Sequence, residues 1–143
     1  MKKTLLIILS LLMLIVLYSC ASKEQNNMEN NTVTFINEVK DADVWILSDT
    51  KENKKTTVWG KATVSKVKTG ESRKAELCEV GDNGQYIFRM IDADSFFYSA
   101  DGISLEPDNI LKIKENDSQS VILEVTDENG ALKNTYKVFK ARL

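Results

Sequence analysis

The sequence predicts an all-β protein: a single antiparallel β-sandwich, immunoglobulin-like or related, of about eight or nine short strands, with a small β-barrel as the alternative. Between residues 33 and 143 apolar and polar residues mostly alternate with a period of two, which is typical of strands with one buried face. Turn-forming runs separate these segments: Gly81-Asp82-Asn83-Gly84, Ala100-Asp101-Gly102 and Asp127-Glu128-Asn129-Gly130.

In the first half of this region, Thr34–Asp43 fits a weak helical face and a strand equally well. Val44–Leu47 is a short apolar strand, Thr57–Val67 is the longest alternating run, and Lys74–Val80 is a weaker strand. The alternation of the long run predicts an inner face of Val58, Gly60, Ala62 and Val64 and an outer face of Trp59, Lys61, Thr63 and Ser65.

The second half is predicted to contain five more strands. They are Tyr86–Ile91, Phe96–Ala100, Ile110–Lys114, Val121–Thr126 and a last strand from Leu132 to about Arg142. Asn129-Gly130 suits positive φ, so the last two strands should form a hairpin. Within the last strand the alternating apolar positions shift from Tyr136 and Val138 to Phe139, Ala141 and Leu143, which predicts a β-bulge.

The N-terminus reads as a targeting segment. Lys2-Lys3 is followed by an apolar run from Leu5 to Leu17 that only Ser10 interrupts. The segment resembles the signal peptide of bacterial lipoproteins, in which a Leu-x-small-Cys lipobox ends the apolar run; Leu17, Ser19 and Cys20 match it, and Tyr18 departs from it. The resemblance implies acyl chains, such as palmitate, on Cys20 and a place on a membrane of the cell envelope. Because no Asp follows Cys20, it implies the outer membrane where there are two.

Two other interpretations of this segment stay open: secretion with cleavage after Ala21, and an uncleaved anchor. A spanning helix needs roughly 20 apolar residues and about 14 are present. The predicted organisation is therefore a signal peptide at 1–19, a disordered tether at 20–32 and one β domain at 33–143. The tether is polar and Asn-rich, a composition that does not support a packed core.

Composition excludes several function classes. The chain contains no His, which removes Ser-His-Asp and Cys-His catalysis and imidazole-based metal sites. Without Lys2 and Lys3, 17 basic residues face 21 acidic ones, a formal charge of −4, so no nucleic-acid partner is expected. No catalytic residue, cofactor or metal ligand is predicted. Once Cys20 is acylated, Cys78 has no disulfide partner, and we expect its thiol to be buried.

Trp59 is the foremost candidate for binding, because the alternation places it on the polar face. An exposed Trp on a strand serves as a stacking platform for sugar rings or an anchor for a protein partner; Trp45 is the second candidate anchor. The alternative is that a loop or the N-terminal segment covers Trp59. Consecutive side chains of Phe96-Phe97-Tyr98 must point to opposite faces, so either both faces are buried or one meets a partner.

Asp92, Asp94 and Asp101, with Asp82 in a separate turn, are the acidic candidates. A calcium-loop pattern breaks at Phe96, so these are expected to be solvated turn residues. The sequence thus favours a membrane-tethered, non-enzymatic binding module of the cell envelope, held to the bilayer by Cys20, with an envelope protein or glycan as partner. A small carboxylate-dependent hydrolase and a structural subunit of an envelope complex are the alternatives.

Overall fold

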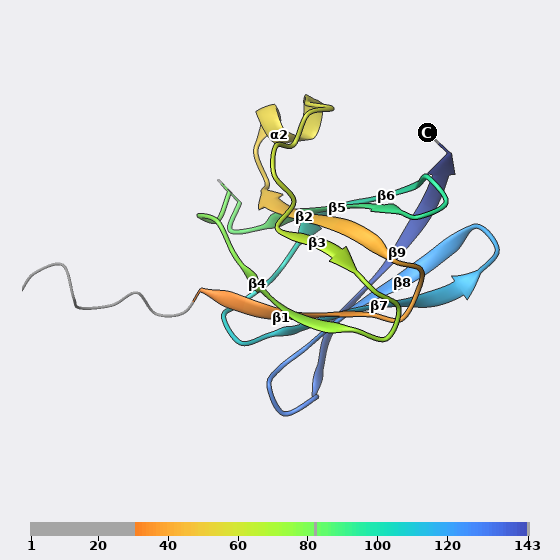
Figure 1. Cartoon of the computed structure of the whole chain (residues 1–143). Helices are drawn as coiled ribbons and strands as arrows, with labels where there is room; N and C mark the ends of the chain where they lie inside the picture. Colours follow the sequence, from red (N-terminus) through yellow and green to blue (C-terminus); the bar gives the residue numbers. More distant parts are fainter. Residues whose placement is uncertain (1–30, 82, 143) are drawn as a thin grey trace, which may run out of the picture.

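One continuous sheet curls until its two edge strands approach each other (Figure 1). The computed structural model describes residues 31–81 and 83–142. In these residues the order of strands across the sheet is β3-β2-β5-β6-β9-β8-β7-β1-β4. The elements are β1 (Thr32–Asn37), β2 (Ala42–Ser48), α2 (Lys51–Lys55), β3 (Val64–Val67), β4 (Ser72–Glu76), β5 (Tyr86–Asp92), β6 (Phe96–Ile103), β7 (Ile110–Asp117), β8 (Ser120–Thr126) and β9 (Leu132–Arg142).

Strand β9 joins the two halves of the sheet. Its residues 132–139 pair with β8, and its residues 140–142 pair with 96–98 of β6. The halves face each other as in a sandwich and are continuous through β9 as in a barrel. All pairings are antiparallel except that of β1 with β7. The all-β prediction is confirmed.

The hydrophobic core lies inside the curled sheet and follows the alternation of the strands. In β8, for example, Val121, Leu123 and Val125 are fully buried, while Ile122 and Glu124 between them are partly exposed. Complete burial of such a side chain contributes about 1.5–3 kcal/mol. The largest core side chains with less than 2% exposure include Tyr98, Phe35, Phe88, Met90, Ile103, Leu111, Ile113 and Leu123.

The first part of the domain settles one open alternative and departs from the predicted pattern once. Thr34–Asp43 takes the strand alternative: it contains most of β1, a turn after Asn37 and the start of β2. The side-chain amide of Asn37 donates to the carbonyls of Lys40 and Val67. The predicted strand 57–67 is a strand only from Val64, because Gly60 has φ +68°, a left-handed conformation that ends an extended run. Val58, predicted to face inward, is 79% exposed.

The structure of β9 explains why the apolar residues in its sequence shift from one set of alternating positions to the other. Val138 is buried and Phe139 is 64% exposed, yet the pairing with β8 is regular from Asn134 to Phe139. The predicted bulge is therefore not at this position; the register shifts instead near Leu132, beside the hairpin turn. Phe139 faces outward because the side chains continue to alternate between the two faces of the strand. At the other end of the chain β1 begins at Thr32, one residue inside the predicted tether.

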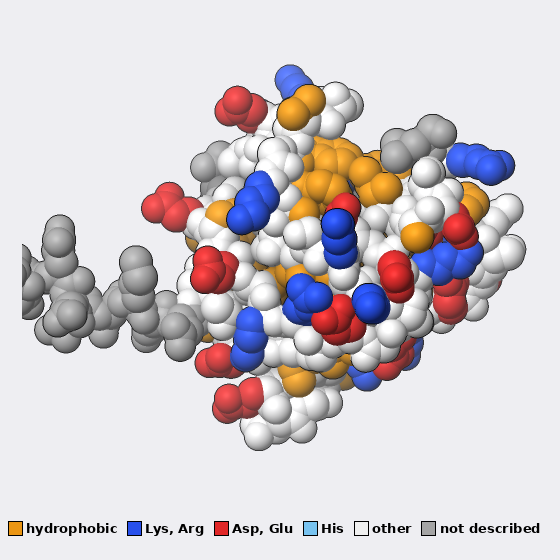
Figure 2. All heavy atoms as spheres, in the orientation of Figure 1, with side chains coloured by type: hydrophobic (Ala, Val, Ile, Leu, Met, Phe, Trp, Pro, Cys, Tyr) orange, Lys and Arg blue, Asp and Glu red, His pale blue; other side chains and the backbone are white. Residues whose placement is uncertain are grey.

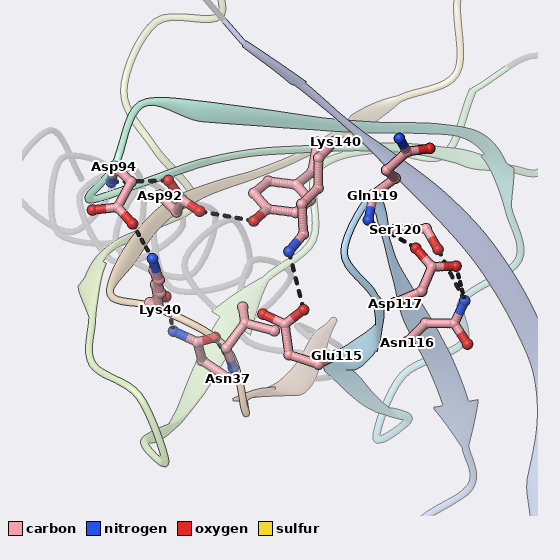
Figure 3. Close-up of polar contacts among 12 residues, drawn as sticks. Asn37, Lys40, Asp92, Asp94, Glu115, Asn116, Asp117, Gln119, Ser120 and Lys140 are labelled. Carbon is pink, nitrogen blue, oxygen red and sulfur yellow. Dashed lines mark hydrogen bonds and ion pairs between the residues drawn. The ribbon is translucent and has the colours of Figure 1, made fainter.

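A polar network closes one end of the curled sheet (Figure 3). Asp92, 5% exposed, accepts hydrogen bonds from the backbone N–H groups of Asp94 and Phe96 and from the hydroxyl of Tyr98 at 2.7 Å. Burial, followed by the hydrogen bond to Asp92, raises the pKa of Tyr98. Lys40 pairs with Asp94 at the same end. The network fixes the β5–β6 turn to the core.

The opposite end of the sheet is closed by the chain between β4 and β5. The hydroxyl of Ser48 donates to the carbonyl of Glu79, and Gly81 packs so closely on Asp49 that a Cβ would lie 2.3 Å from its carbonyl oxygen. Only glycine fits this approach. Cys78, also in this crossing, is exposed, which corrects the prediction of a buried thiol. Its sulfur lies 3.3 Å from the Ser48 hydroxyl oxygen, at the rim of the sheet and outside the packed interior.

Candidate functional site: an aromatic groove on the outer face

The segment from Asp49 to Thr63 lies over the outer face of β2, β5 and β6, and α2 projects from this side of the molecule (Figure 1). Its local structure begins at Thr50, whose hydroxyl accepts the N–H of Asn53 and caps α2. The side-chain amide of Asn53 donates to the carbonyl of Ser48. These bonds turn the chain back over the sheet that it has just left.

Three aromatic rings join the segment to the sheet. Trp59 stacks on Phe97 with ring centroids 5.4 Å apart and planes 7° apart, and it meets Trp45 edge-on at 5.4 Å. The indole N–H of Trp59 donates to the carbonyl of Thr56, and that of Trp45 donates to the carbonyl of Gly60. Both indoles therefore have a polar partner while their rings pack, which is the arrangement that buried Trp requires.

The pairing of residues between strands shows which side chains lie next to this cluster on the outer face of the sheet. Trp45 pairs with Arg89, which pairs with Ser99; Ile91 pairs with Phe97 one row further along. Because side chains alternate, all of these lie on the outer side of the sheet. Hydrophobic side chains gather on the surface below the projecting segment in the space-filling view (Figure 2). This side of the sheet thus has a second, smaller apolar cluster.

Two ion pairs lie at the base of the segment, one within it and one between β5 and β6 beneath it. Lys54 Nζ lies 2.7 Å from Asp49 Oδ1, and Arg89 Nη1 lies 2.8 Å from Asp101 Oδ1. The other carboxylate oxygen of Asp49, which is 3% exposed, accepts the N–H of Gly102. The hydrogen bond to Asp49 raises the pKa of Lys54. Both buried charges in the group, Asp49 and Arg89, have a partner of opposite sign, as buried charges must.

A groove of about 490 Å³ runs between the segment and the sheet; we call it the aromatic groove. Its wall is residues 54–57, and its floor comes from β5 and β6. A second hollow of about 370 Å³ borders the same Ile91 and continues toward Asp41 and Lys66. The residues lining the aromatic groove are Lys54, Lys55, Thr56, Thr57, Trp59, Arg89, Ile91, Phe97 and Ser99.

The two predicted anchors are brought together, though not as expected. Trp59 is half-buried and belongs to a loop, so it is part of the cover over the sheet and is not a residue on a bare strand. Trp45 lies on β2 beneath it. Of the aromatic run, Tyr98 is buried inside, Phe96 packs partly against the core, and Phe97 is covered by Trp59. Both faces of β6 are therefore covered at this point, one of the two alternatives.

The predicted acidic residues do not form one site. Asp92 and Asp94 belong to the turn before β6, whereas Asp101 lies roughly 16 Å further along that strand and pairs with Arg89. Asp92 is buried and is not a solvated turn residue; Asp82 falls outside the described residues. Among the residues that the structure describes, no group of three or more acidic or Cys side chains is placed to hold a metal ion.

Cys20 and the whole targeting segment also lie outside the described residues. In the described part of the chain no helix has the length and apolarity to cross a membrane. No protein-family model, curated protein or solved structure matches this chain. The site must therefore be interpreted from its own chemistry.

Sequence reasoning missed the polar half of the groove. The sequence pattern assigns no role to Lys54 or Lys55, and it includes Arg89 only as a member of the predicted strand Tyr86–Ile91. A charged residue in the middle of the run Tyr86–Ile91 was the available signal, because a buried Arg needs a partner and so indicates that something covers that face. The position of Ser99 opposite Arg89 depends on strand register alone.

Proposed function

We propose that this protein is a membrane-tethered binding module of the bacterial cell envelope and that the aromatic groove is its ligand site. The tether is the acylated Cys20 with the polar residues that follow it, as the resemblance of residues 1–20 to lipoprotein signals implies. Acyl chains bind a bilayer at about 0.8 kcal/mol per buried methylene. The domain is then confined near the membrane, where even a modest affinity for a neighbouring polymer suffices.

The observation that supports the groove most is its combination of groups. Trp59 and Phe97 offer apolar ring surface, Thr56, Thr57 and Ser99 offer hydroxyls, and lysines stand at the wall. Pockets that bind ligands typically combine a largely apolar lining with a few polar groups that orient the ligand. A volume of about 490 Å³ lies within the range of such sites.

The tether is tested by metabolic labelling of the full chain with an alkyne-bearing palmitate analogue. We expect label and envelope association in the wild-type chain and loss of both in Cys20→Ser. A wild-type protein that reaches the envelope with an unlabelled, free thiol at residue 20 contradicts the tether.

The groove is tested by photo-crosslinking in intact envelopes. A benzophenone amino acid replaces Ser99, which lines the groove, or Thr135, an exposed residue of β9 away from it. We expect a discrete adduct from position 99, none from position 135, and loss of the adduct when Trp59→Leu is added. Equal adducts from both positions, or an adduct indifferent to Trp59→Leu, argue against the groove as the ligand site.

A further inference from the structure

We infer that the ligand of the aromatic groove is an acidic carbohydrate, a sugar chain bearing carboxylate or phosphate groups. This inference rests on the proposed function and names the chemistry of its ligand. It is drawn from three features of the groove: the ring surface, the hydroxyls and an uncompensated cation.

The uncompensated cation is Lys55. Lys54 is paired with Asp49 and Arg89 with Asp101, so these two cations are already neutralised. In residues 31–81 and 83–142 no acidic side chain pairs with Lys55, which is exposed and lines the groove. The stretch 51–61 holds four lysines and one glutamate in a chain whose net charge is −2. The local field at the groove wall therefore favours an anion.

The ring and hydroxyl groups favour a sugar over an aliphatic anion. A pyranose ring has one apolar C–H face, which packs on an aromatic ring, and an edge of hydroxyls, which needs hydrogen-bond partners. The groove provides aromatic surface from Trp59 and from the part of Phe97 that Trp59 leaves uncovered, and Thr57 and Ser99 are exposed donors and acceptors beside it. A pocket for a lipid chain is lined by apolar groups alone, whereas the aromatic groove has aromatic rings and hydroxyls side by side.

The shape favours a chain of several rings. The second hollow is also lined by Ile91, so it lies beside the aromatic groove, and together the two hollows extend over β2, β5 and β6. Lys66 and Lys68 line the second hollow, together with Asp41, Asp43 and Asp92. Asp41 and Asp43 each accept a backbone N–H, of Thr69 and Lys66 respectively. A polymer that extends past Ile91 thus meets two further lysine side chains and the three carboxylates beside them.

A nucleic-acid strand also combines stackable rings with negative charge and is the main rival. The acidic net charge of the chain opposes it, because binding a phosphate backbone relies on a broad cationic surface. The groove has a single unpaired lysine in its wall, which matches a ligand that places one acidic group in the groove.

The test is titration calorimetry of the full chain in detergent with three probes: a galacturonic acid trimer, its methyl ester, and a short single-stranded oligothymidylate. The ester keeps the rings and removes the charge. We expect the acid to bind roughly tenfold or more tightly than the ester, and its affinity to fall as salt rises from about 50 to 300 mM.

The variant Lys55→Gln should weaken acid binding by roughly three- to tenfold and leave the ester unchanged. Lys61→Gln is the matched control, an exposed lysine of the same segment that does not line the groove. Phe97→Leu should weaken both sugars, with far-ultraviolet circular dichroism confirming that the fold is retained.

Three outcomes overturn the inference. If the ester binds as well as the acid, the charge argument fails while the proposed binding groove stands. If oligothymidylate binds more tightly than the acid and responds to Lys55→Gln, the ligand class is wrong. If neither sugar binds, the carbohydrate inference fails, and the envelope crosslinks from position 99 still decide whether the groove is a ligand site.

Discussion

The interior of the curled sheet and the aromatic cluster outside it are built in different ways. Interior residues such as Phe88 and Leu123 come from strands, alternate along them and are less than 2% exposed. The outer cluster joins two strand residues, Trp45 and Phe97, with Trp59 from an irregular loop, and all three stay partly exposed. The interior therefore stabilises the fold, whereas the outer cluster positions one segment and leaves a groove beside it.

The largest expected effect belongs to the interior. Phe88, 1% exposed, lies with its ring 6.2 Å from that of Phe35. Phe88→Ala leaves a cavity in a packed core and should lower the free energy of unfolding by about 4 kcal/mol. Urea denaturation followed by far-ultraviolet circular dichroism measures it. A loss below about 1 kcal/mol means that this ring is not central to the core.

Removing the outer cluster should have a smaller effect. Trp59 is only half-buried, so Trp59→Ala should lower the free energy of unfolding by about 2 kcal/mol, roughly half of a fully buried aromatic truncation. Hydrogen exchange should show the amides of the segment 49–63 opening while those of β5 and β8 stay protected. If Trp59→Ala unfolds the whole domain, the outer cluster is part of the core and the comparison fails.

The interior also contains a polar contact whose strength depends on pH. Burial and the bond to Asp92 raise the pKa of Tyr98, so the folded chain keeps this phenol protonated at a pH where the unfolded chain has lost the proton. Its contribution to stability is therefore complete below about pH 10 and declines above it, by up to about 1.4 kcal/mol per pH unit.

Tyr98→Phe isolates this contribution. At neutral pH the variant should be less stable by about 1 kcal/mol, since the hydroxyl no longer bonds to Asp92. Above about pH 10 the difference from the wild-type chain should shrink, because only the wild-type chain has this titration. Denaturation at several pH values tests this, and a difference that is constant up to pH 11 contradicts it.

The smallest effect is expected from Phe139, the outward residue beside buried Val138. Phe139→Ala should change the free energy of unfolding by no more than about 0.5 kcal/mol, as for most surface substitutions. Its matched control, Val138→Ala, removes fewer atoms but should lower stability by about 1.5 kcal/mol. The reverse order would place Phe139 inside and reinstate a bulge in β9.

Local chemistry made much of the fold predictable. Strand β8 follows from alternation along its residues and β5 from a run of mostly apolar residues, and Asn129-Gly130 suits the turn that joins β8 to β9. The loop at 56–63 was not predictable in this way, since the alternation around Trp59 is real in the sequence. What decides its conformation is the left-handed Gly60 and the contact of Trp59 with Phe97, far along the chain.

The candidate site was only partly predictable, because its residues come together through contacts between distant parts of the chain. Trp59 and Trp45 are conspicuous as single residues, but their proximity depends on a loop folding back over β2. The pairing of Arg89 with Asp101 likewise depends on β5 and β6 lying side by side, whereas that of Lys54 with Asp49 is local to the turn of chain around α2. Without the folded structure, Lys55 cannot be recognised as the lysine of the groove lining that has no acidic partner among the described residues.

The chain has two tryptophans, and both are in the outer cluster with their rings 5.4 Å apart. All indole fluorescence of this protein consequently originates from the surface cluster and none from the barrel interior. An emission shift reports detachment of the segment or occupation of the groove, even while the strands remain intact. A melting curve recorded by tryptophan fluorescence should therefore have a lower midpoint temperature than one recorded by backbone circular dichroism. The difference between the two midpoints measures how independently the segment moves.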